Sequence, residues 1–406
     1  MYPSDDYPES WFPVDFKDTE IAFQHKTDFD LARSYLIFLL TKSPFLVKFL
    51  SRSAKLFLSM GLPIEPIIKA TVFKQFCGGE TRKEYQKVID QLAQANIGAI
   101  LDYSVEGEGD EAEFDKTAQA IIETIKAARF ADNIPCACMK MTGIGDAALF
   151  AKMTARQTLS QTEALAWTSL KGRLEAICKQ AADASTPIYI DAEESWIQAA
   201  MDALAEKMMR THNQNRAIVF TTLQLYRTDR VEYFNQLIAM ARKKSLRLGV
   251  KIVRGAYMEQ ERERARKMAY PSPIHMDKAA TDQAFDACIH LFIDNIDMVE
   301  ICVGTHNEYS CKLLTGLMAE RNIPANHPHI YFSQLYGMSD HISFRLAHAG
   351  YNVTKYLPYG PVASTLPYLA RRAEENTAIA GQMSKELDII IKERQRRKRV
   401  RQGEPR

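Results

Sequence analysis

Two adjacent arginines near the carboxyl end of the chain are the residues whose types and spacing most directly suggest chemistry. In the stretch YLPYGPVASTLPYLARRAEENT (356–377), Arg371, Arg372 and Glu375 follow Tyr368 by three, four and seven positions. On a helix these four side chains share one face. Two neighbouring guanidinium groups suit two-pronged capture of a carboxylate, and Glu375 could brace one of them. The alternative is a solvated face that only keeps an amphipathic helix soluble.

The elements that must position these arginines are predicted from about residue 96 onward, where short apolar runs alternate with longer helical stretches. This alternation is typical of parallel β/α units. Eight runs predict strands: NIGAILDYSVE (96–106), PCACMKMTG (135–143), PIYIDAEE (187–194), AIVFTTLQLY (217–226), RLGVKIVRGAY (247–257), MVEICVGTHN (298–307), HIYFSQLYGM (329–338) and NVTKYLPYG (352–360). Eight such units close into a barrel, so we expect an α/β protein with a (β/α)8 fold. The last run leads directly into the arginine helix, which would then lie over the barrel mouth.

Polar or ionisable side chains stand at the carboxyl end of every predicted strand. They are Glu106, Lys140, Asp191, Gln224, Arg254 with Tyr257, His306 with Asn307, Gln334 and Tyr359. In a (β/α)8 barrel these ends form the catalytic face. Polar residues also end strands because loops are solvated, so it is the repetition over eight strands that indicates a site.

The two ends of the chain differ from the barrel region. Residues 18–75 carry apolar residues at three- and four-residue steps and predict helices. We therefore expect a helical arm at 1–75, a barrel at 76–385 and a basic tail at 386–406. The segment KERQRRKRVRQ (392–402) could be a solvated helix end that frays into disorder, or a contact with anionic lipid or nucleic acid.

Composition favours a soluble, reduced enzyme. The chain has 406 residues, of which 46% are apolar and 25% are charged, and its net charge of +2 argues against a dedicated nucleic-acid binder. Its seven cysteines are irregularly spaced and form no C-x-x-C pair, which favours a cytoplasmic location without disulfides. The acidic, Pro-rich N-terminus is unlike a signal or transit peptide, and the apolar run SYLIFLL (34–40) is too short to span a bilayer.

The segment GIGDAA (143–148) matches the G-x-G-x-x-A dinucleotide fingerprint, after a predicted strand and before a predicted helix. The match lacks a second strand ending in an acidic residue soon afterwards, because a long helical region extends to about residue 184. A tight strand-to-helix turn explains the same glycines.

The segment HPH (327–329) contains two histidines with no third clustered ligand, so we expect a loop and no metal site.

Several motifs in order along the chain resemble the flavin-dependent proline dehydrogenase family. They are CMKMTGIG, IYIDAEES, VRGAY, GTHN, QLYGM, YLPYGPV and YLARRAEENT, and the resemblance covers roughly residues 70–380. It implies a distorted (β/α)8 barrel that binds FAD without a Rossmann fingerprint, with its last helix above the barrel mouth. It also implies oxidation of L-proline to 1-pyrroline-5-carboxylate by hydride transfer to FAD. Electrons would pass to a quinone-type acceptor, and peripheral membrane contact is a further hypothesis. The length of the chain suits a monofunctional, bacterial-type enzyme.

The resemblance also implies roles for individual residues. Arg371 and Arg372 would hold the proline carboxylate, and Tyr368 and Tyr356 would line the pocket, where the Tyr356 ring fills the space that a 4-hydroxyl group would need. The other substrate-site positions are Lys140 and Glu106, and Glu106 would pair with the first arginine as a gate when substrate is absent. The catalytic positions are Lys140, Asp191 and Tyr257. The flavin positions are Gln224, Lys251, Val253, Arg254, Gly255, Thr281, Thr305, His306, Asn307, Gln334 and Glu375. Lys251 stands where arginine is usual, so two-pronged contact with the flavin would be lost there.

Two other functions remain as alternatives. The first is a nicotinamide-dependent oxidoreductase that uses the GIGDAA turn, and the second is a module that docks nucleic acid through the basic tail. A flavoprotein is yellow and a nicotinamide-dependent enzyme is colourless, so an absorption spectrum separates the first alternative from the flavoenzyme.

Overall fold

The computed structural model describes residues 7–43, 62–103, 109–363 and 382–403, with single positions at 53, 57, 60, 365, 366 and 369. Five of the predicted site residues lie outside the described residues: Glu106, Tyr368, Arg371, Arg372 and Glu375. What the sequence predicts for these five stays a prediction.

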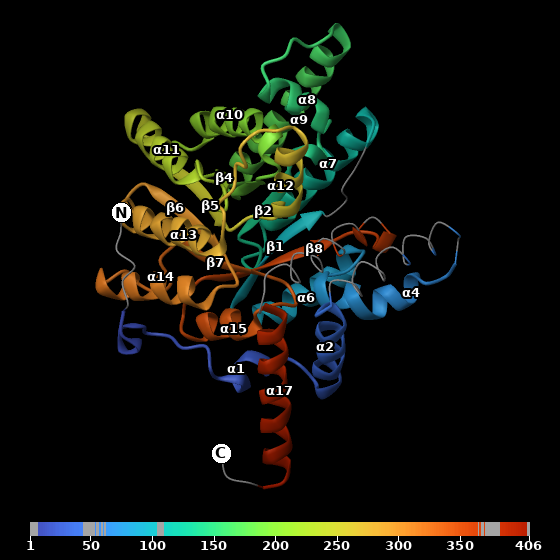
Figure 1. Ribbon diagram of the computed structural model, residues 1–406, viewed down its shortest axis with the longest axis vertical. Helices are drawn as coiled ribbons and strands as arrows, with labels where there is room; N and C mark the ends of the chain where they lie inside the picture. The colour runs from blue at the N-terminus through green and yellow to red at the C-terminus, as the bar shows by residue number, and fades with distance from the viewer. Residues whose placement is uncertain are drawn as a thin grey trace.

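Eight parallel strands close into a barrel in the order of the sequence (Figure 1). They are β1 (Ile97–Tyr103), β2 (Cys136–Lys140), β3 (Ile188–Asp191), β4 (Val219–Gln224), β5 (Leu248–Val253), β6 (Val299–Gly304), β7 (Ile330–Leu335) and β8 (Val353–Tyr359). The barrel closes where β1 pairs with β8, in a register that places Ile97 beside Val353 and Tyr103 beside Tyr359. Each strand lies within one of the eight predicted runs, so the (β/α)8 prediction is confirmed.

Helices surround the barrel (Figure 1). They are α6 (Arg82–Ala93), α7 (Glu111–Ala128), α8 (Ala147–Thr154), α9 (Gln161–Ala184), α10 (Ser195–His212), α11 (Arg230–Lys244), α12 (Met258–Lys267), α13 (Lys278–Ile293), α14 (Glu308–Glu320) and α15 (Asp340–His348), with the short 3-10 helix η3 (Met141–Gly143) after β2. Side-chain caps define several of their first turns. Asp110 and Asp277 each accept a hydrogen bond from the backbone N–H three residues later, as a helix N-terminus requires.

The core has two layers because each strand is buried on both faces. The larger layer lies between the strands and the surrounding helices and contains apolar residues such as Leu174, Ile177 and Phe285. The second layer fills the barrel itself. Its members are Ile100, Cys136, Cys138, Tyr189, Ala217, Phe220, Cys302 and Tyr356. All seven cysteines are buried free thiols, which agrees with the expectation of no disulfides.

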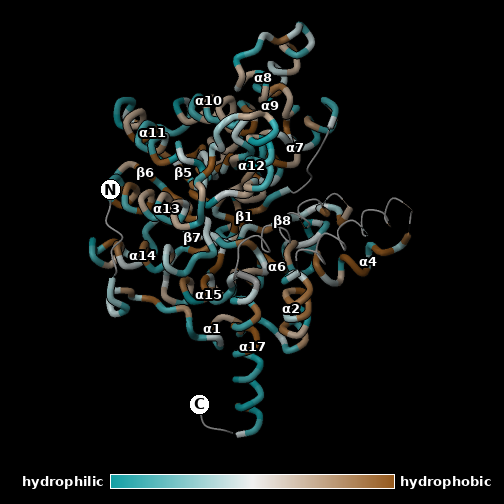
Figure 2. Tube along the Cα trace, in the orientation of Figure 1, coloured by the Kyte–Doolittle hydropathy of each residue, from teal (hydrophilic) through white to brown (hydrophobic). Residues whose placement is uncertain are grey.

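The N-terminal arm consists of short elements that lead to the barrel. They are η1 (Glu9–Trp11), α1 (Thr19–Phe23), α2 (Asp28–Thr41), α4 (Glu65–Ile68), the π-helical turn η2 (Lys69–Phe73) and α5 (Lys74–Phe76). In Figure 2 the tube through α2 and α4 is largely brown, because this part of the arm is rich in apolar residues. The segment that follows the arm meets the barrel where Gly79 forms an isolated parallel bridge with Tyr359 at the end of β8.

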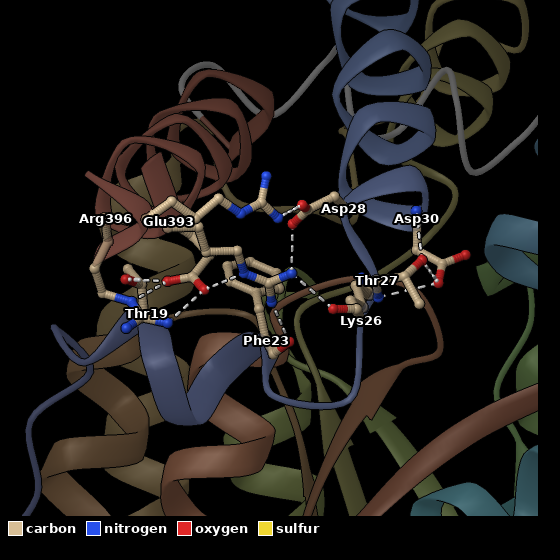
Figure 3. Close-up of polar contacts among 10 residues, drawn as sticks. Thr19, Phe23, Lys26, Thr27, Asp28, Asp30, Glu393 and Arg396 are labelled. Carbon is tan, nitrogen blue, oxygen red and sulfur yellow. Dashed lines mark hydrogen bonds and ion pairs between the residues drawn. The ribbon is translucent and has the colours of Figure 1, made fainter. Parts of the chain in front are cut away.

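The basic tail forms helix α17 (Gln382–Arg401), which packs against α1 and α2. Glu393 lies on the buried side of α17 and accepts hydrogen bonds from Thr19 Oγ1 at 2.9 Å, Arg396 Nε at 2.8 Å and Arg397 Nε at 2.7 Å. Figure 3 shows Glu393 and Arg396 beside Thr19 of the arm. The expectation that the tail frays is wrong, because these contacts hold the helix against the arm as far as Arg401.

Candidate active site

Three polar side chains from strands β3, β5 and β8 meet inside the barrel. Lys251 Nζ lies 2.5 Å from Asp191 Oδ1, and the Tyr356 hydroxyl donates to Asp191 Oδ2 at 2.9 Å. The ammonium group of Lys251 also lies 5.0 Å from the centroid of the Tyr356 ring. Strand β8 pairs with neither β3 nor β5, so only closure of the barrel brings these three residues together.

The ion pair determines the charge state of Lys251. Burial by itself lowers the pKa of a lysine, but the Asp191 carboxylate raises the pKa of Lys251 above its ordinary value. Lys251 is therefore a buried, permanent cation. Burial also raises the pKa of the neighbouring Cys136, Cys138 and Cys302 thiols, so these three sulfurs stay protonated and serve as packing.

Lys140 ends β2, where its register partner is Asp191 at the end of β3. It lines a small cavity between β1, β2 and α7, together with Asp102, Tyr103, Cys138 and Thr142. Asp102 is a buried carboxyl group from β1 that sequence reasoning did not single out. Its signal was an acidic residue that directly follows the apolar stretch IGAIL (97–101). The cavity therefore combines an ammonium group, a carboxyl group and a hydroxyl group at the carboxyl ends of β1 and β2.

Glu193, in the loop after β3, is a second buried carboxyl group that sequence reasoning missed. It accepts hydrogen bonds from Thr142 N at 3.2 Å and Thr142 Oγ1 at 2.6 Å. Burial raises the pKa of Glu193 to about 7, although the Thr142 hydrogen bonds and the Lys140 charge act in the opposite direction. Its backbone oxygen accepts from Gln224 Nε2 at 2.7 Å. Glu193 thus connects the Lys140 side of the barrel mouth to Gln224.

Gln224 and the turn after β5 form the next part of the mouth. Gln224 Oε1 accepts from Ala256 N at 3.0 Å, which ties β4 to the Val253–Tyr257 turn. In this turn Gly255 has a φ of +138°, and a Cβ atom there would lie 2.4 Å from the Tyr226 ring. Only glycine suits that combination of backbone and space. Tyr257 is buried at the start of α12, so the turn has a single conformation.

Arg254 has the most densely bonded side chain of the mouth. Its guanidinium donates to Asp282 Oδ1 at 2.6 Å, Thr305 Oγ1 at 2.6 Å and Ser310 Oγ at 2.9 Å. It also lies 4.3 Å from the centroid of the Phe285 ring. Described residues use three of the five N–H groups that an arginine offers. Arg254 is therefore held in place by α13, the loop after β6 and α14.

The loop after β6 places the remaining predicted cofactor residues. Asn307 caps α14 by accepting from Tyr309 N and Ser310 N, and its own N–H donates to Thr305 Oγ1. Gln334 on β7 donates to Thr305 O at 3.1 Å. Thr281 differs from this group, because its buried hydroxyl donates to Asp277 O within its own helix turn. The structure therefore brings together the predicted cofactor positions of β4 to β7, whereas the Thr281 hydroxyl is engaged within its own helix.

The GIGDAA segment forms the turn from β2 through η3 into α8. Asp146 caps α8 by accepting from Ala148 N at 2.8 Å. A Cβ atom at Gly145 would lie 2.1 Å from Leu170 on α9, so this glycine allows close helix packing. The strand-to-helix turn thus accounts for the motif.

His327 and His329 lie in the loop before β7 with their ring centroids 4.9 Å apart. Within the described ranges, no three His, Cys, Asp or Glu side chains are arranged to hold a metal ion.

The donor set at the mouth fits an anionic dinucleotide with a polar sugar chain. Lys251 and Arg254 are buried or half-buried cations, and Gln224, Asn307 and Gln334 supply amides. Lys251 lies within β5, and the other four stand at or just after the carboxyl ends of the consecutive strands β4 to β7, where ligands of barrel enzymes bind. The cavity beside Lys140 adjoins this set through Thr142, Glu193 and Gln224.

Comparison with known sequences gives a family match over the whole barrel. The family described as "Proline dehydrogenase" matches residues 85–385. A protein of Pectobacterium carotovorum subsp. carotovorum named "Carbapenem antibiotics biosynthesis protein CarD" is 34% identical over 322 residues, covering 79% of this chain and 83% of that protein. "Proline dehydrogenase 1, mitochondrial" of Dictyostelium discoideum is 29% identical, with coverage of 94% and 74%. "Hydroxyproline dehydrogenase" of Xenopus laevis is 30% identical, with coverage of 93% and 89%.

Comparison with solved structures agrees with the fold. Proline utilization A from Bdellovibrio bacteriovorus, inactivated by N-propargylglycine, superposes with a TM-score of 0.66 at 19% identity and covers 91% of this chain. Proline utilization A from Bradyrhizobium japonicum gives a TM-score of 0.64 at 19% identity. This chain spans 37% and 32% of the lengths of those two proteins, about a third of each.

Proposed function

The chain belongs to the proline dehydrogenase family, and on this premise we propose that it oxidises L-proline to 1-pyrroline-5-carboxylate with FAD as hydride acceptor. The observation that carries the proposal is the family match over residues 85–385, which spans all eight strands. FAD, when bound, supplies the hydride acceptor that no protein side chain provides. We assign residues 76–385 to the catalytic barrel, with 1–75 as an arm and 386–406 as a tail.

In this proposal the substrate is held at two ends. Arg371 and Arg372 bind the carboxylate, and Tyr356, Tyr368 and Lys140 surround the ring. Holding both ends fixes the reacting C–H bond in one orientation, an effect that contributes up to about 7–11 kcal/mol in favourable cases. Glu106 pairs with the first arginine when no substrate is present.

The amine of the substrate must lose its proton before hydride can leave the neighbouring carbon. A nearby cation disfavours the ammonium form, because like charges repel. Lys140 has this role in the proposal, and its position at the end of β2 beside the small cavity supports it. The positive charge of Lys251 is balanced by its ion pair with Asp191.

The cofactor would be held along the ends of β4 to β7. Arg254 and Lys251 would bind anionic or electron-rich parts of FAD. The polar groups of FAD would be bound by Gln224, Thr305, His306, Asn307 and Gln334. Val253 and Gly255 would approach FAD through their backbone. Glu375 would support the sugar chain. Thr281 would contribute shape, because its hydroxyl already donates to Asp277 O.

The electrons would pass to a quinone-type acceptor at a membrane surface. Within the part of the chain that the structure describes, no helix is both long and apolar enough to cross a bilayer. Leu36, Leu39 and Leu40 are exposed on α2, next to α17. On α17, Lys398 and Arg399 are exposed and belong to no ion pair among the described residues. Exposed apolar side chains and exposed basic side chains each favour contact with an anionic lipid surface.

The function is tested by an absorption spectrum of the purified protein and a steady-state assay with L-proline and an artificial electron acceptor. Arg371→Met should lower kcat/KM for proline at least about tenfold, since it removes a charge-assisted pair of about 1.5–3 kcal/mol, while FAD stays bound. Lys392→Met, an exposed cation on α17, is the matched control. A colourless protein without proline-dependent electron transfer would refute the function. Wild-type efficiency in Arg371→Met would mean that the arginine pair only forms a solvated helix face.

Membrane contact is tested separately by sedimentation with anionic liposomes. The double variant Lys398→Gln, Arg399→Gln removes exposed charge without touching Glu393 or the arginines that bind the arm. We expect weaker binding of the variant at low salt. Equal binding of variant and wild type would remove the tail from the proposal.

A further inference from the structure

The first turn of α17 is attached to the loops that follow β6 and β7. Glu386 is 3% exposed, and its Oε1 atom accepts from Ser339 N at 2.8 Å and from Ser339 Oγ at 3.1 Å. Ser339 Oγ in turn lies 2.8 Å from Nδ1 of His306, a residue assigned above to the cofactor. A continuous set of hydrogen bonds therefore runs from the C-terminal helix to the barrel mouth.

Lys385, the neighbour of Glu386, forms a parallel attachment. Lys385 Nζ lies 2.8 Å from Glu308 Oε1, and His341 Nε2 lies 2.9 Å from the same oxygen. Burial would raise the pKa of Glu308, but the His341 and Lys385 contacts lower it to about 2. Glu308 follows His306 by two positions, so both attachments reach the same loop.

The bond directions in the first attachment determine where the His306 proton lies. A serine hydroxyl has one O–H to donate, and a carboxylate can only accept. The Ser339 O–H therefore points to Glu386, and Ser339 Oγ must accept from His306 Nδ1–H. In the neutral ring this makes Nε2 the acceptor nitrogen. An acceptor nitrogen suits a sugar hydroxyl of the ligand better than a phosphate oxygen.

Ser339 is fully buried and has a φ of +50°, a left-handed conformation that is uncommon for serine. The two hydrogen bonds to Glu386 hold it in this conformation at the start of α15. Its position thus depends on α17, which lies 47 residues further along the chain.

We propose that Glu386 is a positioning residue of the cofactor site, which acts through Ser339 to orient the His306 ring and keep its proton on Nδ1. His306, held in this orientation, then contacts the sugar chain of FAD. The contact with the ligand rests on the proposed function, whereas the proton arrangement of His306 does not. The same attachment sets the position from which the chain enters α17, eleven residues after Glu375.

The test measures the tautomer of His306 by 15N NMR in FAD-free protein at pH 8, with a His306→Gln variant to assign the signal. Wild type and Glu386→Gln, which keeps the acceptor oxygen, should show the Nδ1–H form. Glu386→Ala and Ser339→Ala should lose this preference. Lys385→Ala is the matched control, because it breaks the Glu308 attachment and leaves Ser339 untouched. Ser339→Ala keeps the test decisive if Glu386→Ala does not fold.

A second measurement titrates each FAD-free variant with FAD. Glu386→Ala and Ser339→Ala should bind FAD about fivefold more weakly, the size of one lost net hydrogen bond, while Glu386→Gln binds within twofold of wild type. An unchanged His306 tautomer in both alanine variants would overturn the hydrogen-bond arrangement. A changed tautomer with unchanged FAD affinity would overturn the role at the cofactor site. Absence of FAD binding in wild type would refute the proposed function itself.

Discussion

The Tyr356 hydroxyl donates a hydrogen bond to Asp191 Oδ2 at 2.9 Å, and Asp191 is at the same time paired with Lys251. The phenol ring of Tyr356 is therefore held from both its hydroxyl and its strand. The sequence predicts that this ring faces the substrate and fills the space of a 4-hydroxyl group. A ring held in this way cannot move aside easily, so its volume should act in selection between substrates.

Replacing Tyr356 with Ser should raise the ratio of kcat/KM for 4-hydroxyproline over proline, mostly through lost efficiency with proline. An apolar pocket alone rejects an added hydroxyl only by about 10²-fold, so the ring should add a steric contribution. Both substrates are measured with both proteins. Tyr356→Phe is the control, since it keeps the ring and removes the hydroxyl that donates to Asp191. An unchanged ratio in Tyr356→Ser would mean that the ring does not face the substrate.

Lys140→Ala should slow flavin reduction by proline at least about tenfold, because a one-unit change in the pKa of the bound amine changes its neutral fraction tenfold. Stopped-flow absorbance gives the reduction rate. Reoxidation by the acceptor should stay at the wild-type rate, since Lys140 lies beside the proposed substrate cavity. Loss of reoxidation with normal reduction would contradict this role.

Glu193→Gln should change the pH dependence of stability. The pKa of Glu193 is about 7 in the folded protein and about 4.5 when exposed, so the folded state holds the proton more tightly. The contribution of Glu193 to stability is complete below pH 4.5 and is lost as the pH rises through 7. The difference approaches about 3 kcal/mol by pH 8.

The glutamine variant cannot titrate, so it should gain stability relative to wild type between pH 5 and pH 8. Denaturant unfolding at both pH values measures the gain. Glu232→Gln, an exposed position on α11, should show no such change. Parallel pH profiles for wild type and Glu193→Gln would show that Glu193 titrates normally.

Glu393→Ala should reduce the free energy of unfolding by about 2 kcal/mol. The carboxylate of Glu393 is fully buried, and its removal leaves Thr19, Arg396 and Arg397 without their shared acceptor (Figure 3). Limited proteolysis should also cut α17 sooner. Arg401→Gln is the control, because Arg401 is 70% exposed and surface pairs contribute little. Equal losses in both variants would mean that burial of Glu393 does not matter.

The sequence by itself determined the strands of the barrel and the side chains at their ends. Lys140, Asp191 and Gln224 end their strands as the apolar runs predict, because the pattern of a buried strand and its turn is written in neighbouring residues. For the GIGDAA segment it left a tight turn and a cofactor fingerprint as alternatives, and the close packing of Gly145 on Leu170 supports the turn. Whether the basic segment 392–402 forms a packed helix or frays could not be predicted from its neighbouring residues.

Only the tertiary structure decided which of these side chains are partners. Asp191 meets Lys251 and Tyr356 because the sheet closes on itself, and nothing in the local sequence around any of the three encodes that distance. Thr19 and Glu393 are bonded across 374 positions, and the basic tail becomes a docked helix through such contacts. For the same reason, the residues around Glu386 and Ser339 do not predict that these two side chains are partners. Their hydrogen bonds depend on how α17 packs, and packing between distant segments depends on the shape of the whole chain.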